Sequence, residues 1–321
     1  MKISDRVYGE FIIDSPIISG IIELPTFERL KDISQAGVPT EYNSLPSYSR
    51  YEHSIGVYIL LNKLGASLEE QIAGLLHDIA HLVFSHVAEW VFAENNEFSE
   101  SSNEDLTDKF IDGTDIGDYL EANNISKETI IDFKKFSLLE QPMPFLCADR
   151  VDYAFRDGKY WNVYSELPNE LVTDLKSHSG HMAFQDRHYA RRFADIFLTL
   201  QNDYWGGYDA VFRYYHFSEL LKLLLKKGIL TRSNFFKGES SVLRKIKACK
   251  DSDVINYTKV LKEKDLTKYK GTYKQNIKKK FRYVDPEIIL ENKLVPLSEI
   301  DNDFLEKVNY YKAENEKGID I

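Results

Sequence analysis

Cysteine is scarce in this chain of 321 residues, which contains only Cys147 and Cys249. Two cysteines cannot form the several cross-links of a small disulfide-stabilised domain, so we expect both to be reduced thiols. Glycine and proline are also few, at 16 and 9 residues, which excludes a collagen-like or low-complexity chain. Because 43% of the residues are hydrophobic, the sequence predicts a globular protein with a large core.

Long apolar segments are missing as well. No run approaches the roughly 18–20 apolar residues that a membrane-spanning helix needs. The opening residues, MKISDRVYGEF, lack the apolar centre of a signal peptide. These two features predict a cytoplasmic protein without a membrane partner.

Acidic residues outnumber basic ones by 51 to 41, and the net charge of −10 argues against a general nucleic-acid coat protein. The exception is the tract 242–282, where 14 lysines and arginines face 4 acidic residues. It contains the run Lys278, Lys279, Lys280 and Arg282. One interpretation is a solvated basic face. The other is a surface that binds a polyanion, such as nucleic acid, a nucleotide effector or an acidic partner.

Hydrophobic periodicity predicts a mainly α-helical fold. Apolar residues recur every three or four positions in 25–37, 52–64, 67–79, 84–92, 105–120, 127–136, 145–155, 190–204 and 211–227. Paired β-branched residues in 6–24 predict a short β-hairpin or extended arm, and alternation in 281–297 predicts two strands. The polar residues 94–103 predict a surface loop.

The change in composition near residue 240 predicts two parts. We expect a helical core over residues 1–240 and a small lysine-rich α+β subdomain over residues 241–321.

Half of the eight histidines lie close together in the sequence: His53, His77, His81 and His86. A single buried histidine is usually an ordinary core residue, but burying four titratable rings is costly unless they are paired or bound to a metal. His77 and His81 share one face if the segment is helical, and Asp78 adds a carboxylate. Imidazole and carboxylate together suit one divalent ion, such as Mn²⁺, Mg²⁺, Fe²⁺, Co²⁺, Ni²⁺ or Zn²⁺. A set without thiolates is typical of a hydrolytic site.

At these residues the chain resembles a known family. The ordered motifs are SRYEHS from Ser49, HDIAH from His77, FSH from Phe84, DRVDY from Asp149 and the pair Arg156-Asp157. Together they resemble the HD-domain superfamily of metal-dependent phosphohydrolases, and within it the deoxynucleoside triphosphate triphosphohydrolase (dNTPase) branch. FERL from Phe27, with Ile33, Gln35 and Gly37, resembles the helix before the first metal histidine.

The resemblance implies a role for each matching residue. One divalent metal ion would be held by His53, His77, Asp78 and Asp149. Catalysis would involve His81, His86, Asp78 and Glu89. Phosphate would contact Arg50 and Arg150, and the sugar side would be lined by Gln35, Tyr153 and Asp157. Asp152, three residues after Asp149, is expected to be structural.

The sequence departs from the family pattern at two places. Many dNTPases carry a catalytic His-Glu pair after the FSH motif, and here Asn103 stands in place of that histidine. Asparagine cannot donate a proton as an acid. The later segment from Tyr208 to His216 offers an arginine, tyrosines and a histidine, but their spacing does not match the family.

The resemblance therefore implies a metal-dependent enzyme that converts a deoxynucleoside triphosphate into a deoxynucleoside and triphosphate and that forms a homo-oligomer. Three alternatives stay open. They are another phosphohydrolase of the same fold (a nucleotidase, phosphodiesterase or nuclease), a nucleotide-binding sensor whose catalysis is attenuated by Asn103, and a di-iron oxygenase with additional histidine ligands.

Overall fold

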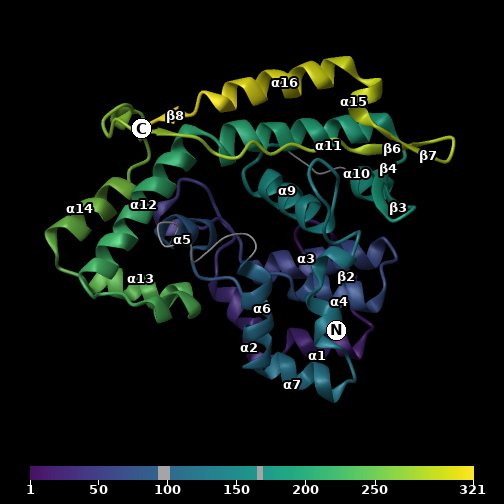
Figure 1. The fold of residues 1–321 in the computed structure, drawn as a ribbon, viewed down its shortest axis with the longest axis horizontal. Helices are drawn as coiled ribbons and strands as arrows, with labels where there is room; N and C mark the ends of the chain where they lie inside the picture. The colour runs from purple at the N-terminus through teal and green to yellow at the C-terminus, as the bar shows by residue number, and fades with distance from the viewer. Residues whose placement is uncertain (93–101, 165–168) are drawn as a thin grey trace. The chain divides into compact units, whose positions relative to one another are not determined.

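The computed structural model describes residues 1–92, 102–164 and 169–321 (Figure 1). The fold is mainly helical, with a β-hairpin at the N-terminus and a small mixed sheet that contains C-terminal strands. The predicted fold class is therefore confirmed. The loop predicted for residues 94–103 lies outside the described ranges as far as residue 101, and residues 102 and 103 begin a helix instead. None of the described helices is long and apolar enough to cross a membrane.

The chain forms two compact units, each assembled from three stretches of sequence. The first unit comprises residues 1–56, 75–132 and 213–265. The second unit comprises residues 57–74, 133–212 and 266–321. The domain boundary predicted at residue 240 from composition falls inside the first unit, and it stays a prediction.

Helices make up most of the first unit. Its elements are β1 (Lys2–Asp5), β2 (Gly9–Ile12), α1 (Pro16–Ile22), α2 (Pro25–Glu28), η1 (Arg29–Asp32), η2 (Thr40–Tyr42), α5 (Ser85–Phe92), α6 (Ser102–Asp112), α7 (Asp115–Ala122), α8 (Lys127–Ile131), η6 (Arg232–Phe236), α13 (Glu239–Ala248) and α14 (Ser252–Leu261). Three helices run from one unit into the other along the chain: α3 (Arg50–Lys63), α4 (Leu68–Leu76) and α12 (Tyr208–Lys226). The core of the first unit contains aromatic contacts, in which the ring of Phe84 packs edge-on against the rings of Phe217 and Phe235.

The second unit combines helices with the mixed sheet. Its elements are η4 (Phe133–Lys135), α9 (Ala148–Tyr160), α10 (Asn169–Asp174), β3 (Leu175–His178), β4 (His181–Phe184), α11 (Arg187–Thr199), the π-helical turn η5 (Leu200–Trp205), η7 (Thr267–Tyr269), β5 (Asn276–Ile277), β6 (Glu287–Leu290), β7 (Lys293–Pro296), α15 (Leu297–Ile300), α16 (Asn302–Glu316) and β8 (Ile319–Asp320). Its core includes the buried rings of Phe155, Phe184, Phe193 and Phe197.

The N-terminal hairpin lies earlier in the chain than predicted. Strands β1 and β2 pair antiparallel, with Ile3 opposite Phe11. The extended structure predicted for residues 16–22 is wrong, because this segment forms α1. Ser15 accepts a hydrogen bond from the Ile18 backbone N–H at 3.4 Å, and Pro16 occupies the first turn. An N-cap followed by proline is a helix start, and this local signal prevailed over β-branched composition.

The mixed sheet has the order β3-β4-β6-β7, with β4 and β6 parallel and the other pairs antiparallel. The strands predicted in 281–297 are confirmed as β6 and β7. The β3–β4 hairpin was not predicted. It turns at Ser179 and Gly180, whose φ angles of 51° and 79° belong to the tight turns that join short hairpins.

Candidate metal centre

The predicted ligands of the first unit come from one helix and one turn. His53 lies near the start of α3, and α4 ends at Leu76. The chain then turns, with the Ile79 N–H donating to the Leu76 carbonyl at 3.0 Å and the His81 N–H donating to the Asp78 carbonyl at 3.1 Å. The helix predicted for 67–79 therefore stops three residues early. His77, Asp78 and His81 project from a turn rather than from one helical face.

His53, His77 and Asp78 are close neighbours. The Nε2 atoms of His53 and His77 lie 3.3 Å apart. The Asp78 carboxylate lies 3.5 Å from His77 Nε2 and 4.0 Å from His53 Nε2. Nitrogen ligands at about 2 Å from one ion stand about 3 Å from each other, so the spacing of the two rings fits a shared metal. The donor set of two imidazoles and a carboxylate suits the divalent ions named above.

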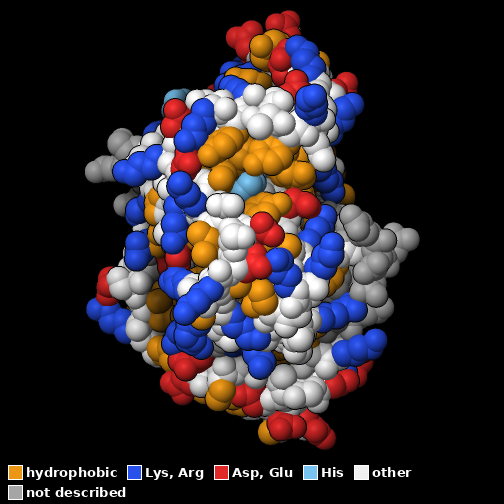
Figure 2. Space-filling view, turned by 90° about the vertical axis from the view of Figure 1, so that its left-hand side faces the viewer, with side chains coloured by type: hydrophobic (Ala, Val, Ile, Leu, Met, Phe, Trp, Pro, Cys, Tyr) orange, Lys and Arg blue, Asp and Glu red, His pale blue; other side chains and the backbone are white. Residues whose placement is uncertain are grey.

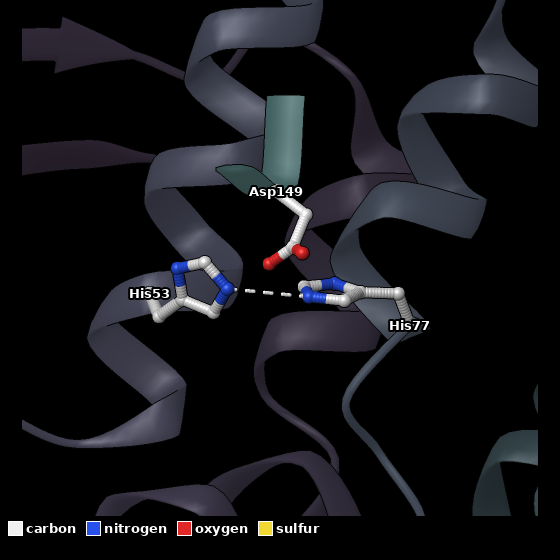
Figure 3. A group of neighbouring side chains, drawn as sticks. All are labelled: His53, His77 and Asp149. Atoms are coloured by element: carbon white, nitrogen blue, oxygen red, sulfur yellow. Dashed lines mark hydrogen bonds between the residues drawn. The ribbon is translucent and has the colours of Figure 1, made fainter. Parts of the chain in front are cut away.

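Figure 3 shows the rings of His53 and His77 with their Nε2 atoms directed at each other, drawn together with Asp149. Asp149, the fourth predicted ligand, is drawn with them, and its place in the ligand set stays a prediction. Asp149 belongs to the second unit, where it lies in the first turn of α9.

Arg50 holds the Asp78 carboxylate. Its Nη1 lies 2.5 Å from Asp78 Oδ2, and its Nε donates to the Ser85 hydroxyl at 2.9 Å. Burial alone would raise the pKa of Asp78, but the charges of Arg50, His77 and His81 hold this pKa well below its ordinary value. Asp78 is therefore a carboxylate at neutral pH. Ser85, which sequence reasoning did not assign, fixes the arginine from the start of α5.

The guanidinium of Arg50 is 2% exposed, and its Nη2 is a buried nitrogen without a hydrogen-bond partner among the described residues. Nε and Nη1 are therefore bonded to protein groups, and Nη2 can donate to an additional acceptor. The predicted phosphate contact of Arg50 stays a prediction.

The two predicted catalytic histidines have different environments. His81 Nε2 lies 3.0 Å from Asp78 Oδ1, and burial together with the charge of Arg50 lowers the pKa of His81. His86 is about 40% exposed, and its Nδ1 lies 3.5 Å from the carboxylate of Glu89. His81 is therefore part of the histidine–aspartate cluster, whereas His86 and Glu89 form a looser pair on α5.

Gln35 lies in the first unit, with its backbone N–H bonded to the Tyr48 carbonyl at 2.9 Å. Its side-chain Oε1 is buried and has no hydrogen-bond partner among the described residues. This acceptor is compatible with the predicted sugar contact, which stays a prediction.

The remaining predicted substrate residues are on α9 of the second unit. Arg150 donates to the backbone carbonyls of Phe145 and, at 3.1 Å, of Gln141. The Trp205 indole N–H donates to Asp157 at 2.7 Å, and the ring of Tyr153 packs edge-on against Trp205. These contacts serve the fold of the unit, and the substrate roles stay predictions.

The segment around Arg213 is structural in its visible contacts. Arg213 donates to the carbonyls of Tyr42, Leu261 and Glu263 at 2.8, 2.5 and 2.9 Å. His216 is buried against the ring of Tyr257. This segment, whose spacing does not match the family, therefore makes packing contacts within the first unit. The side chain of Asn103 lies outside the described residues.

Several lysines of the basic tract 242–282 form ion pairs or hydrogen bonds with other residues of the same unit. Lys247 and Lys262 lie 2.6 and 3.3 Å from Glu41, and Lys279 donates to the Trp205 carbonyl at 2.7 Å. Figure 2 shows a face on which lysine and arginine side chains are interspersed with acidic and apolar ones. The polyanion-binding surface stays a prediction.

Comparison with known proteins bears on this cluster. The HD domain family model matches residues 50–145, which include His53, His77 and Asp78. The chain is 33% identical to the uncharacterized protein YdhJ of Bacillus subtilis over 93% of this chain and 91% of that protein. It is 34% identical to the metal-dependent phosphohydrolase cns2 of Cordyceps militaris, over 63% of this chain and 58% of that protein.

Two further similarities are partial or low in sequence identity. The deoxynucleoside triphosphate triphosphohydrolase SAMHD1 of Bos taurus is 36% identical, over 26% of this chain and 17% of that protein. The crystal structure of a hypothetical protein from Aquifex aeolicus shares the fold, with a TM-score of 0.71 at 18% identity. That match covers 95% of this chain and 93% of the other.

Proposed function

The chain belongs to the HD-domain family of metal-dependent phosphohydrolases, and from this premise we propose that it converts deoxynucleoside triphosphates into deoxynucleosides and triphosphate. The observation that carries the proposal is the cluster of His53, His77 and Asp78, whose donor atoms lie within 4.0 Å of one another. Arg50 adds a buried positive charge to this cluster, and His81 adds a second titratable ring.

A divalent ion held by His53, His77, Asp78 and Asp149 would neutralise charge on a phosphoryl oxygen and make a nearby water more acidic. The reaction adds the oxygen of one water to the α-phosphorus and breaks its bond to O5′. The proton lost by the water and the proton gained by O5′ must each pass through a group of the site. The cluster offers such a group in His81.

The hydrogen bonding of His81 defines which proton it can move. An ionised carboxylate only accepts hydrogen bonds, so the contact with Asp78 assigns a hydrogen to His81 Nε2. Because the pKa of His81 is lowered, the ring is neutral near pH 7 and its Nδ1 carries the lone pair that can accept a proton. This chemistry supports His81 as a general base rather than as an acid.

Arg50 contributes charge and order. Its two protein contacts fix the guanidinium, and its Nη2 remains available for an oxygen of a phosphoryl group. A donor fixed before the reaction stabilises developing negative charge without the cost of reorganisation. Gln35 Oε1 offers an acceptor for a sugar hydroxyl in the same unit.

A second candidate is hydrolysis of another nucleotide phosphoester. The observation in its favour is the extent of the matches, because the similarity to the metal-dependent phosphohydrolase cns2 covers 63% of this chain and that to SAMHD1 covers 26%. The homo-oligomeric state, the cytoplasmic location and the polyanion partner of the tract 242–282 are likewise proposals.

Product analysis separates the two candidates. The full-length protein is incubated with each dNTP, NTP and dNMP and with Mn²⁺, Mg²⁺ or Co²⁺, and products are identified by ³¹P NMR. We expect triphosphate from dNTPs, loss of this activity in His77→Ala, and full activity in His188→Ala, which removes an exposed histidine. Orthophosphate from a monophosphate would favour the second candidate. Absence of turnover on all substrates would contradict both.

A further inference from the structure

A short antiparallel bridge in the first unit joins the backbones of two residues assigned to the substrate above, Gln35 and Arg50. The Gln35 N–H donates to the Tyr48 carbonyl at 2.9 Å. The Arg50 N–H donates to the Ile33 carbonyl at 2.8 Å. These two hydrogen bonds fix the backbone of the sugar contact relative to the backbone of the phosphate contact.

Ser34, the residue before Gln35, is held by a carboxylate from a distant part of the chain. The Ser34 N–H donates to Glu239 Oε2 at 3.0 Å, and the Ser34 hydroxyl donates to Glu239 Oε1 at 3.1 Å. Glu239 lies in the first turn of α13, 205 residues further along the chain. The two oxygens of one carboxylate thus accept both donors of one residue, which fixes the orientation of Ser34 as a single hydrogen bond would not.

The direction of the Gln35 side chain follows from that of Ser34. The segment is extended, with a φ of −133° and a ψ of 115° at Ile33 and a β-bridge at Ser34. Successive side chains of an extended segment point to opposite faces. Since the Ser34 hydroxyl is directed at Glu239, the side chain of Gln35 is directed to the other face. Glu239 therefore controls the orientation of Gln35 from the opposite side of the segment.

The carboxyl group of Glu239 is costly to bury. The side chain is 6% exposed, and burial raises its pKa, while the hydrogen bonds from Ser34 reduce that rise. The nearby charge of Asp32 adds to the rise. An apolar side chain would pack in the same place without this cost, which points to the hydrogen bonds with Ser34 as the role of Glu239.

The backbone after Gln35 is held as well. The Tyr214 hydroxyl, on α12, donates to the Ala36 carbonyl at 3.0 Å. Gly37 has a φ of 63°, and a Cβ atom at this position would lie 3.2 Å from the Phe84 carbonyl oxygen, so a larger residue would be strained there. Gln35 therefore lies between two anchored residues. An acceptor held in this way loses little entropy when a ligand binds.

We propose that Glu239 is a positioning residue for substrate binding, whose carboxylate holds Ser34 and thereby places Gln35 Oε1 at the sugar hydroxyl of the nucleotide. This rests on the proposed function, in which Gln35 accepts a hydrogen bond from that hydroxyl. A deoxynucleoside 5′-phosphate has one free sugar hydroxyl, at the 3′ position. Glu239 therefore determines how strongly the enzyme distinguishes a nucleotide with this hydroxyl from one without it.

The test is a double-mutant cycle in the full-length protein, with Glu239→Ala, Gln35→Ala and both changes together. Steady-state kinetics use a deoxynucleotide that the parent protein hydrolyses. We expect Glu239→Ala to raise KM about tenfold and to leave kcat within about twofold, because a contact remote from the reacting phosphorus affects binding rather than chemistry. In the Gln35→Ala background the same change should alter KM less than about twofold, since the two residues act as one unit.

The substrate provides a second cycle. The 2′,3′-dideoxy analogue of the same nucleotide lacks the hydroxyl that Gln35 is proposed to contact. On this analogue the parent and Glu239→Ala should have KM values within about twofold of each other. A merely structural role of Glu239 would raise KM on both substrates alike.

Ser240→Ala is the matched control at the same end of α13. The Ser240 hydroxyl donates to Asp32 Oδ2 at 2.7 Å, so this variant loses a hydrogen bond of α13 and keeps the contact between Glu239 and Ser34. Its KM should change less than about twofold. Glu239→Gln keeps an acceptor for the Ser34 N–H and should restore most of the parent KM.

Ser34→Ala keeps the test decisive if Glu239→Ala fails to fold. It removes one of the two hydrogen bonds to Glu239 and should raise KM about threefold on the deoxynucleotide, with no effect on the dideoxy analogue. If the parent hydrolyses the nucleotide, an unchanged KM in these variants, an equal rise on both substrates, or additive effects with Gln35→Ala would overturn the proposal. Absence of hydrolysis of every nucleotide by the parent would contradict the proposed function itself, and the role of Glu239 would fall with it.

Discussion

Two buried arginine–aspartate pairs invite comparison, one in each unit. Arg50 and Asp78 lie 2.5 Å apart with side chains 2% and 6% exposed. Arg156 and Asp152 lie 2.7 Å apart on consecutive turns of α9, and both side chains are fully buried. As ion pairs they are nearly equivalent.

Their neighbours differ. The second carboxylate oxygen of Asp78 lies 3.5 Å from His77 and 3.0 Å from His81, so the pair is one edge of a cluster of titratable groups. The ion pair of Arg156 and Asp152 has the i,i+4 spacing of a helix-stabilising contact, and a titratable group near it is the Tyr164 phenol rather than a histidine. A buried ion pair therefore indicates chemistry only when other ligating or titratable groups share its atoms.

The largest expected effect follows from Asp78→Asn. The change removes a proposed metal ligand and the anchor of His81, so turnover should fall by more than about 10³-fold. The measurement is kcat per folded molecule together with Mn²⁺ affinity by calorimetry. Retention of both would contradict the assignment of Asp78.

The matched change in the other pair is Asp152→Asn. It leaves the buried guanidinium of Arg156 without its carboxylate, and breaking a buried pair costs about 3–5 kcal/mol of unfolding free energy. Denaturant unfolding measures this loss. The activity per folded molecule should stay within about twofold of the parent, and a parallel loss of activity would remove the distinction between the two pairs.

The two predicted catalytic histidines sharpen the comparison inside the first unit. His81→Asn should lower kcat by about 10²-fold or more, because general base catalysis contributes about 10²–10⁴-fold. His86→Asn should lower kcat less than about tenfold, because this ring is about 40% exposed and its contact with Glu89 is a loose 3.5 Å. Steady-state kinetics of both variants decide the order, and a larger effect of His86→Asn would reverse the assignment.

A histidine outside the cluster should affect stability instead. Burial lowers the pKa of His216 to about 4, so the unfolded state binds more protons than the folded state between pH 6.5 and 4. Stability from this group is complete above pH 6.5 and is lost as the pH falls toward 4. The loss between pH 7 and 5 is at most about 2 kcal/mol. His216→Leu should flatten this dependence in denaturant unfolding, and an unchanged slope would contradict the interpretation.

The smallest expected effect on kcat comes from Arg29, which contacts the turn that carries His77, Asp78 and His81. Arg29 donates to the carbonyls of Ile79 and His81 at 2.8 and 3.1 Å. Arg29→Ala should lower kcat about tenfold, since groups that orient ligands contribute about 10–100-fold. Lys31→Ala, which removes an exposed charge from the same short helix, should have no effect. Equal kinetics for the two variants would show that Arg29 does not position the turn.

The residues of the candidate site could be predicted from the sequence, but the backbone structure that positions them could not. The resemblance to the HD-domain motifs predicted His53, His77 and Asp78 as ligands, and the structure brings these three side chains close together. The end of α4 at Leu76 was missed, since the apolar period continues through Ile79 while the chain already turns. Periodicity reports burial, and a buried turn has the same signal as a buried helix.

Contacts distant in sequence were beyond prediction. The partner of Arg50 at Ser85, 35 residues further along the chain, depends on tertiary packing. The β3–β4 hairpin was missed although its Ser179-Gly180 turn is a local signal. The strands at 287–296 were predictable because alternation and the Glu291-Asn292 turn are local signals.

The most direct test of the central claim measures the metal and the reaction on one sample. The purified protein and its His77→Ala variant are titrated with Mn²⁺ by calorimetry and then given dNTPs, with products followed by ³¹P NMR. The account predicts that the parent binds Mn²⁺ and releases triphosphate, and that the variant loses both. Equal Mn²⁺ binding by the two proteins, or phosphate release that persists in the variant, would contradict a hydrolytic metal centre at His53, His77 and Asp78.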